Sequence, residues 1–380
     1  MKLIFIITER RADFSRFKPI IKLIKKEKKL NYHLVVTGTH LEKKHGYTIK
    51  EIRDEKIKIY KTFRMFDKQY FLNNDGAEMS SAIGIALKKI SKILKLSKPD
   101  LILSGFDIGA NFAATVCGAH MNIPVAHIQG GEVSGTIDES LRHAMTKFSN
   151  FHFTANKETK KRLIKMGEIS KSIFTVGCPS IDALVNEKKI SKKEIYKKFN
   201  IDLNKRFLLV IQHPVTSEIK NSSTQMISTL KAIKDVGIQH LIIFPNSDAG
   251  SKKIINLVKK SNLNFTSTLN LSEYKTFLSS DMILVGNSSS GIHEAATFNV
   301  PVINIGTRQD GRTKPNNVIN VNHKKSEILN AIKIATSSEF LNKIRYIKNP
   351  YGNGNSSKLI VNIIKKLRLK NFNTQKKLTY

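Results

Sequence analysis

Cysteine, tryptophan and acidic side chains are scarce in this chain of 380 residues. It contains two cysteines, Cys117 and Cys178, no tryptophan, and 30 acidic residues against 64 lysines and arginines. Two distant cysteines without a CxxC spacing argue against a disulfide framework and a zinc site, so we expect a reducing, cytoplasmic location. No apolar run reaches 18 residues, and the first one ends before Thr8. The sequence therefore predicts neither a membrane span nor a signal peptide.

The excess of basic residues gives a formal net charge of +34. The lysines occur as pairs along almost every predicted helix, a pattern that a biased composition produces without any partner. No zinc finger, RRM or helix-turn-helix signature accompanies them, so nucleic acid is not an expected partner. A basic cleft that attracts a pyrophosphate is the alternative explanation of the charge.

Short apolar, β-branched runs alternate with amphipathic segments, which predicts parallel sheets wound by helices. Strands are expected at 3–7, 33–36, 101–103, 123–128, 151–153 and 173–176, and in a second series at 207–211, 241–244, 281–285 and 300–305. We therefore expect an α/β protein with two Rossmann-like domains, residues 1–184 and 185–350. Residues 351–380 are expected to form a C-terminal helix and a basic tail.

Open parallel sheets bind ligands beyond the carboxyl ends of their strands, so polar residues that follow the apolar runs are candidates for a site. The densest such segment is HIQGGEVSGTIDESLRH, residues 127–143. Its two glycines allow a tight turn, and Glu132, Asp138 and Arg142 follow within twelve residues. A helix cap at Asp138 with Arg142 as its partner would use only one of these carboxylates. The remaining carboxylates of the segment, Glu132 and Glu139, are not explained by a helix cap and indicate a chemical role.

Two further segments have the same position relative to a predicted strand. In VGNSSSGIHEAATFNVPVINIG, residues 285–306, a serine-rich turn precedes a predicted helix at 291–298 whose free N–H groups would bind a phosphate. Ser289 and Ser290 add donors and Glu294 is placed to accept from ribose hydroxyls, although an ordinary serine cap would also explain the turn. His213 follows the strand at 207–211 and so lies at a sheet edge.

Several motifs of other enzyme classes are missing. No lysine follows the glycine of the serine-rich turn, which excludes a Walker P-loop. The sequence has no HExxH, no paired Cys/His spacing and no Gly-x-Ser-x-Gly, so metal-assisted hydrolysis and acyl transfer have no support. We expect no metal and no cofactor.

Seven blocks of the sequence resemble, in the same order, the UDP-N-acetylglucosamine 2-epimerase family, and particularly its hydrolysing branch of sialic- and legionaminic-acid biosynthesis. They are TERRADFSRFKPII (8–21), VTGTHLEKKHGYT (36–48), NIPVAHIQGGEVSGTIDESLRHAMTKFSNFHF (122–153), VGCPSID (176–182), QHPVTSE (212–218), GNSSSGIHEA (286–295) and NIGTRQDGR (304–312). The resemblance implies two domains of the glycosyltransferase-B type, a nucleotide sugar bound in the interdomain cleft, and a homodimer.

The chemistry of this family removes the proton at C2 of the sugar while the nucleoside diphosphate leaves C1, which gives a glycal-like intermediate. In the hydrolysing branch water then adds to the double bond and releases a free 2-epimerised N-acetylhexosamine. Such a reaction needs a carboxylate base near C2, a second acid/base group and cations beside the pyrophosphate.

By motif position, the resemblance implies that Glu132, Asp138 and Asp107 are the catalytic carboxylates. His213 would lie beside the pyrophosphate and sugar, and Arg142 would orient Asp138 or touch the substrate. The expected substrate- and nucleotide-binding residues are Arg10, His40, Ser289, Ser290, Gly291, Glu294 and Arg308. Asp107 stands in a loop that departs from the Gly-Asp-Arg-x-Glu of many relatives.

Gln129, with Glu132 three residues later, favours the hydrolysing branch, because non-hydrolysing members carry Glu where Gln129 stands. A non-hydrolysing epimerase, a two-domain glycosyltransferase and a binding protein without catalysis are the alternatives. The sequence does not distinguish UDP from GDP, nor N-acetylglucosamine from a diacetamido trideoxy sugar.

Overall fold

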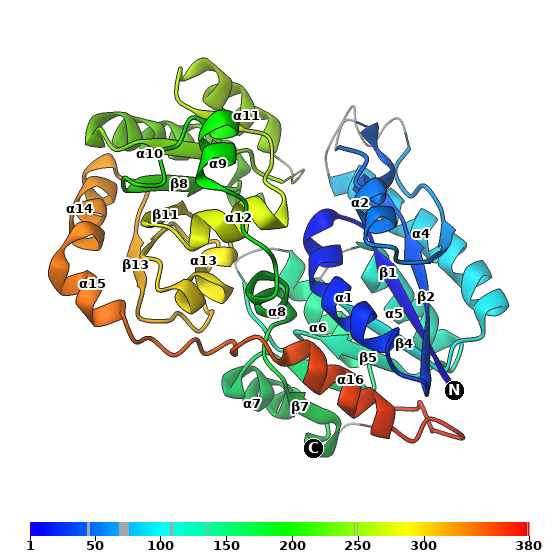
Figure 1. Ribbon diagram of the computed structural model, residues 1–380. Helices are drawn as coiled ribbons and strands as arrows, with labels where there is room; N and C mark the ends of the chain where they lie inside the picture. The colour runs from blue at the N-terminus through cyan, green and yellow to red at the C-terminus, as the bar shows by residue number, and fades with distance from the viewer. Residues whose placement is uncertain are drawn as a thin grey trace. The chain divides into compact units, whose positions relative to one another are not determined.

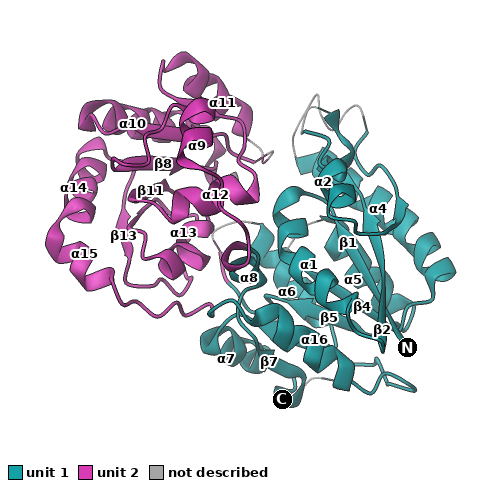
Figure 2. Ribbon diagram, viewed as in Figure 1, with its two compact units in different colours: residues 1–132, 137–183, 352–380 teal, residues 133–136, 184–351 magenta. Residues whose placement is uncertain are grey.

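Two parallel sheets organise the protein in a computed structural model, which describes residues 1–43, 46–67, 76–106, 109–134, 137–246, 248, 250–377 and 379. The chain divides into two compact units (Figure 2). Unit 1 contains Met1–Glu132, Ile137–Ala183 and Gly352–Tyr380, and unit 2 contains Val133–Thr136 and Leu184–Tyr351. Each unit carries one sheet with helices around it (Figure 1), so the predicted fold class is confirmed.

The sheet of unit 1 has seven strands in the order β3-β2-β1-β4-β5-β6-β7, and all neighbouring strands are parallel. Its strands are β1 (Lys2–Thr8), β2 (Leu30–Val36), β3 (Ile59–Thr62), β4 (Leu101–Gly105), β5 (Val125–Ile128), β6 (Phe151–Thr154) and β7 (Ile173–Thr175). Ile4 and Ile6 belong to one core cluster, whereas Phe5 and Ile7 belong to another. Because both faces of the sheet are buried, its inner strands are continuously apolar rather than alternating.

The main helices of unit 1 are α1 (Arg11–Ile24), α2 (Ile49–Asp54), α4 (Gly76–Ser97), α5 (Gly109–His120), α6 (Asp138–Phe148), α7 (Lys157–Lys165) and α16 (Ser356–Lys366). Helix α16 comes from the far end of the chain and packs against α1 (Figure 1). The Asp182 carboxylate accepts hydrogen bonds from the first backbone N–H groups of α16, those of Ser356 and Ser357. At the other end, Lys2 Nζ donates to the carbonyls of Ile364 and Lys365. Both ends of α16 are thus fixed to unit 1.

The sheet of unit 2 has six parallel strands in the order β10-β9-β8-β11-β12-β13. Its strands are β8 (Phe207–Ile211), β9 (His240–Ile243), β10 (Phe265–Thr266), β11 (Met282–Gly286), β12 (Val302–Ile305) and β13 (Val318–Val321). The helices are α9 (Lys192–Phe199), α10 (Ser222–Val236), α11 (Ser251–Lys260), α12 (Leu271–Leu278), α13 (Ser290–His293), α14 (Lys325–Thr336) and α15 (Ser338–Ile344). Helix α8 (Pro179–Val185) contains the chain's passage from unit 1 into unit 2.

The prediction of one regular helix at 291–298 is wrong. The segment is a single α-helical turn, α13, followed by a 3-10 turn, η5 (Ala295–Phe298). It ends at Asn299, whose backbone is left-handed with φ 54°. The helical part of this connection is only one α-helical turn and one 3-10 turn, so a helix dipole contributes little here.

Each sheet reverses its winding direction at one place. In unit 1 the chain runs from β1 outward to β2 and β3 and then returns to β4 on the other side of β1. In unit 2 it runs from β8 to β9 and β10 and then returns to β11. Ligands of open parallel sheets bind beyond the carboxyl ends of the strands that flank such a switch point. The residues after β1, β4, β8 and β11 are therefore the ones to inspect.

Among the residues that the structure describes, no helix combines the length and the apolar character needed to cross a membrane.

Candidate functional site

Directly after β1, a buried hydrogen-bond network orders the turn into α1. The Asp13 carboxylate accepts from Thr8 Oγ1 at 2.7 Å and from the backbone N–H groups of Glu9 and Arg10 at 2.9 Å each. These bonds begin the helix at Arg11. They also hold Glu9 and Arg10 at the carboxyl edge of β1, where sequence reasoning placed Arg10.

His40 lies behind this turn and is fully buried. Its Nε2 lies 3.1 Å from Thr8 Oγ1, and its Nδ1 lies 2.7 Å from Thr48 Oγ1. Burial lowers the pKa of His40, with Asp13 acting in the opposite direction, so the ring is neutral. Because both ring nitrogens are used within the protein, this geometry favours a supporting position for His40 over a direct contact with substrate.

Glu9 is a further carboxyl group at this edge, and sequence reasoning did not select it. Its Oε2 accepts from the backbone N–H of Ala110 at 3.0 Å, near the start of α5. Burial raises the pKa of Glu9, Arg10 lowers it, and the negative charge of Asp138 raises it again. Burial and the negative charge of Asp138 thus both disfavour the ionised form of Glu9. Its signal in the sequence is its place between the end of β1 and the start of α1, next to Arg10.

The loop after β5 carries the predicted carboxylate Glu132, which is 3% exposed. Gln129 has a left-handed backbone with φ 62°, a strained conformation that is typical of functional loops. Gly131 has φ 80°, and a side chain there would meet the Thr159 carbonyl at 2.6 Å, so only glycine fits. The backbone of this loop is thus fixed residue by residue up to Glu132.

Arg16 of α1 contacts two residues with left-handed backbones, which follow the neighbouring strands β4 and β5. Its NH1 donates to Gln129 Oε1 at 3.2 Å, and its guanidinium lies 5.1 Å from the centre of the Phe106 ring. Phe106 follows β4 and is also left-handed, with φ 68°. The predicted catalytic residue Asp107 follows Phe106 and lies outside the described residues. Arg16 was missed because an arginine on a helix usually indicates only a solvated face.

Helix α6 positions the remaining predicted residues of unit 1. Asp138 is its first residue, and Arg142 lies one turn later with 1% exposure. Arg142 NH1 donates to the backbone carbonyl of Glu132 at 2.8 Å. The helix therefore holds the loop that carries Glu132, and it places Asp138 at the end nearest to that loop.

In unit 2 the two central strands are tied together at the switch point by Asn287. The Asn287 side chain accepts from the backbone N–H of His213 at 2.7 Å and donates to the backbone carbonyl of His213 at 2.9 Å. The backbone N–H of Asn246 donates to His213 Nδ1 at 3.2 Å. Since Nδ1 accepts, the neutral ring carries its proton on Nε2 and can donate from that atom. His213 follows β8 at the sheet edge, as the sequence predicted.

The serine-rich turn after β11 presents hydroxyl groups on a one-turn helix. Tyr274 of α12 donates to Ser290 Oγ at 2.6 Å, and Ser288 Oγ lies 3.2 Å from the same atom. Burial raises the pKa of Tyr274, and the nearby Glu294 raises it further, so the phenol stays protonated as a donor. Ser290 and Glu294 are thus brought together as expected, through a tyrosine that sequence reasoning missed.

A chain of polar side chains extends the site after β12. Arg308 NH1 and Gln309 Nε2 both donate to the Asn287 carbonyl, at 3.2 and 2.8 Å. Arg312 donates to Gln309 Oε1 at 2.7 Å and to the carbonyl of Val133 at 2.9 Å. Arg308 therefore lies next to the serine-rich turn, where a cation can neutralise a bound phosphate.

Asn287 offers a stability test of this edge. Replacing it by leucine removes two buried hydrogen bonds and leaves the backbone groups of His213 without them. We expect the free energy of unfolding to fall by about 2–3 kcal/mol. Urea denaturation followed by circular dichroism measures it. The matched control is Asn342→Leu on the exposed side of α15, where the expected change stays within about 0.5 kcal/mol. Equal effects of the two variants would contradict the structural role of Asn287.

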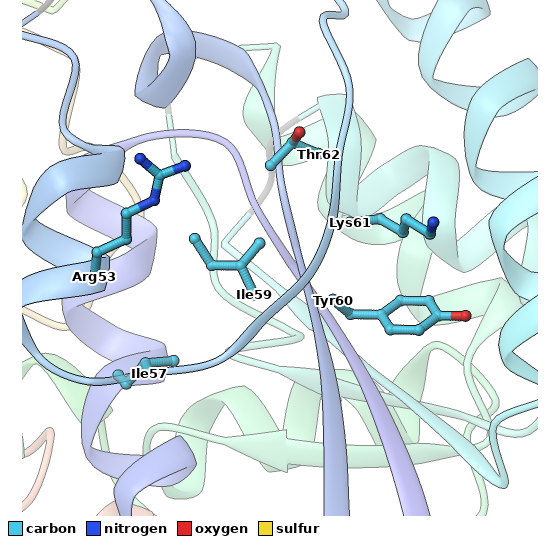
Figure 3. A pocket seen from close by; sticks show the side chains of 6 residues that line it. All are labelled: Arg53, Ile57, Ile59, Tyr60, Lys61 and Thr62. Atoms are coloured by element: carbon cyan, nitrogen blue, oxygen red, sulfur yellow. The ribbon is translucent and has the colours of Figure 1, made fainter.

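A pocket of about 510 Å³ lies in unit 1 between α2 and the edge strand β3 (Figure 3). It is lined by Arg53, Ile57, Ile59, Tyr60, Lys61 and Thr62. None of these residues belongs to the predicted set, and the lining combines two cationic side chains with two isoleucines. Within the described part of the chain, no group of three or more His, Cys, Asp or Glu side chains is arranged to hold a metal ion.

Comparison with known proteins adds independent information. The family model described as UDP-N-acetylglucosamine 2-epimerase matches residues 22–365. A Legionella pneumophila protein named UDP-N,N'-diacetylbacillosamine 2-epimerase (hydrolyzing) is 33% identical over 96% of both chains. A Neisseria meningitidis serogroup B protein named UDP-N-acetylglucosamine 2-epimerase is 32% identical over 89% of this chain and 88% of its own.

Solved structures share the fold. The crystal structure of UDP-GlcNAc 2-epimerase from Neisseria meningitidis bound to UDP-GlcNAc has a TM-score of 0.83 at 21% identity, and the match covers 97% of this chain and 100% of that one. A putative UDP-N-acetylglucosamine 2-epimerase from Listeria monocytogenes has a TM-score of 0.79 at 17% identity, with 96% of each chain covered.

Proposed function

The chain belongs to the UDP-N-acetylglucosamine 2-epimerase family, and from this premise we propose that it is a hydrolysing 2-epimerase of a nucleoside-diphosphate N-acetylhexosamine. In this reaction the nucleoside diphosphate leaves C1 as the proton at C2 is removed. Water then adds to the glycal, and the free sugar with inverted C2 is released.

The loop that contains Gln129 and Glu132 is the observation that favours the hydrolysing branch. An amide stands at the first position and a carboxylate three residues later, on a backbone that Gly131 and Arg142 fix. The hydrolysing relative from Legionella pneumophila, which is similar over 96% of this chain, supports the same choice. The name of that relative also makes a UDP-linked diacetamido sugar the first substrate to test.

The described residues fit the steps of this chemistry. We assign proton removal at C2 and the later proton return to Glu132 and Asp138. A positioned general base or acid of this kind contributes roughly 10²–10⁴ in rate. Burial raises the pKa of Glu9 and the negative charge of Asp138 raises it further, so these two carboxyl groups influence each other electrostatically.

The residues of unit 2 fit the departing nucleotide. We assign Ser289, Ser290 and the N–H of Gly291 to the diphosphate as hydrogen-bond donors, together with Nε2 of His213. The guanidinium of Arg308 supplies positive charge to the leaving group. Glu294, beside Tyr274 and Ser290, is assigned to the ribose hydroxyls.

The experiment that tests the proposal uses UDP- and GDP-linked N-acetylhexosamines, plain and diacetamido, in deuterated water. We expect one of them to yield a free sugar with inverted C2 that carries deuterium at C2, as observed by NMR. Proton abstraction and re-addition both occur on the enzyme, so the label enters during turnover. The Glu132→Gln variant is the matched control and should give no labelled product.

Two other outcomes would contradict the proposal. An intact, epimerised nucleotide sugar identifies a non-hydrolysing epimerase. Release of nucleotide only when an acceptor sugar is present identifies a glycosyltransferase. The panel also decides between UDP and GDP, because the pyrimidine and purine substrates are tested side by side. A homodimer and a place in sialic- or legionaminic-type sugar synthesis stay predictions of the resemblance, and a cytoplasmic location stays a prediction from the cysteine content.

A further inference from the structure

A buried group of titratable side chains lies in unit 1 outside the residues assigned so far. His127 of β5 and His152 of β6 are register partners on neighbouring strands, and both are fully buried. Register partners in a parallel pair point to the same face of the sheet. Glu168, which follows α7 and is 3% exposed, accepts from His152 Nε2 at 2.9 Å. We call these three side chains the imidazole–carboxylate cluster.

The C-terminal end of the chain closes over this cluster. Lys376 Nζ lies 2.5 Å from Glu168 Oε2 and donates to the Thr146 carbonyl at 2.9 Å. The segment is anchored before it, because Asn150 Nδ2 donates to the Thr374 carbonyl at 3.0 Å. The rings of Phe372 and Phe151 also pack with their centres 5.0 Å apart. A lysine that is more than 200 residues distant in sequence is thus placed beside β6 and α6.

One face of the cluster supports the loop that carries Glu132. His127 is the third residue of β5, and the loop begins two residues later. A side chain at Gly130 would lie 2.9 Å from His127 Nδ1, so the loop backbone rests directly on the imidazole. Thr146 Oγ1 lies 3.3 Å from the same nitrogen. Movement of the His127 ring therefore displaces the loop or α6.

Helix α6 also connects Lys376 to the loop that carries Glu132. Lys376 holds the carbonyl of Thr146 near the end of this helix, and Lys147 also reaches Glu168, at 3.2 Å. At the beginning of the same helix, Arg142 holds the Glu132 carbonyl. The tail thus fixes one end of a helix whose other end fixes the loop.

We infer that Lys376 is a positioning residue for the proposed reaction, because its ammonium group fixes the cluster and the helix on which the loop of Glu132 rests. The inference depends on the proposed function only for its kinetic readout. Lys376 does not touch the substrate in this scheme. It acts through Glu168, the two imidazoles and α6.

The charges around the two imidazoles lead to a measurable expectation for their pKa values. Burial lowers the pKa of His127 well below its usual value, and the charges of four neighbours lower it further, namely His152, Arg142, Lys376 and His143. Burial also lowers the pKa of His152, with Glu168 opposing and Lys376 and Lys147 adding to the effect. Removing the charge of Lys376 therefore raises the pKa of both imidazoles. Their protonation then begins at a higher pH and places positive charge under the Glu132 loop.

The test compares Lys376→Met with Lys376→Gln and Lys376→Arg, and uses Lys377→Met on the neighbouring exposed lysine as the matched control. We expect the methionine and glutamine variants to lose about tenfold in kcat with little change in KM. The acid limb of kcat/KM should move upward by roughly one pH unit in both. Arginine keeps the charge and should restore the wild-type limb, and the control should match the wild type.

NMR titration of the histidine ring signals provides a readout that needs no turnover. We expect the signals of His127 and His152 to titrate at higher pH in the methionine and glutamine variants. The glutamine variant keeps a donor for the Thr146 carbonyl, so it remains folded if methionine destabilises the tail.

Wild-type histidine titration and wild-type pH profiles in both neutral variants would overturn the inference. A lower melting temperature with an unshifted profile would do the same, because it indicates a structural anchor only. A wild-type enzyme that releases no free sugar contradicts the proposed function instead, and the histidine titration then still decides the role of Lys376.

Discussion

Replacing Glu132 by glutamine is expected to reduce the rate of sugar release by roughly 10²–10⁴ while the protein stays folded. Glutamine has the size of glutamate, and the backbone carbonyl that Arg142 holds is unchanged. The loss therefore reports the proton-transferring carboxylate rather than the loop. Steady-state release of the nucleoside diphosphate and of free sugar measures the effect, and the melting temperature monitors folding.

The same variant, compared with Asp138→Asn, separates the two halves of the reaction. Loss of the group that removes the C2 proton abolishes both nucleotide release and deuterium exchange. Loss of the group that only returns the proton allows nucleotide to leave, so the glycal accumulates. NMR of the reaction mixture distinguishes these outcomes, since the glycal has a vinylic proton that neither substrate nor product has.

Glu158→Gln is the control for Glu132→Gln. Glu158 lies at the exposed start of α7 and pairs only weakly with Lys161 across one helical turn. Its replacement should leave the rate of sugar release unchanged. An activity of Glu132→Gln within about threefold of the wild type would remove Glu132 from the mechanism.

Replacing Glu168 by glutamine is expected to cost about 3 kcal/mol of stability at pH 7, the largest effect that we expect on folding. Burial alone raises the pKa of Glu168, but the hydrogen bond from His152 and the contact with Lys376 outweigh it and lower the pKa to about 2. The neutral amide leaves the partly exposed ammonium groups of Lys147 and Lys376 without the carboxylate that they approach, and it leaves the buried His152 without its acidic partner.

The sign of the pH dependence follows from the direction of this shift. The carboxyl group has a lower pKa in the folded protein than the ordinary 4.5, so its contribution is complete above about pH 4.5. It is lost as the pH falls from there towards 2. Glutamine does not titrate, so the stability difference between wild type and variant should shrink over this interval.

Urea denaturation between pH 7 and pH 2.5 measures both effects. Glu187→Gln, in the connection before α9, is the control because its carboxylate accepts from Ser272 near the surface of unit 2. It should cost less than about 1 kcal/mol. A constant difference between wild type and Glu168→Gln at every pH would show that the pKa of Glu168 is the same in the folded and the unfolded protein, which contradicts the lowered pKa.

The positions of the predicted strands and of most predicted site residues followed from the sequence. Inner strands such as β1 and β8 are buried on both faces, so their apolar runs stand out from the surrounding residues. Polar residues at their carboxyl ends, such as His213, then lie at a sheet edge whatever the details of packing. The turn at Gly131 is also predictable from the sequence, because a buried tight turn with a positive φ needs glycine.

Three strands of the described chain were not predicted, and all three lie at edges of their sheets. Strand β3 contains Lys61, β10 has two residues, and β13 is only partly buried. An edge strand has one neighbour and one open side, so it needs no continuous apolar run. The serine-rich turn was predicted, but the regular helix expected after it is one α-helical turn and a 3-10 turn in the structure.

Local sequence pattern alone determined the two parallel sheets, their inner strands and the polar residues that end them, because backbone hydrogen bonding and burial act over a few neighbouring residues. Only the tertiary structure decided which distant side chains meet. Arg16 reaches Gln129, Tyr274 reaches Ser290, and Lys376 reaches Glu168. Such contacts join residues from about 16 to more than 200 positions apart and leave no periodic trace in the sequence, since each depends on the packing of whole elements.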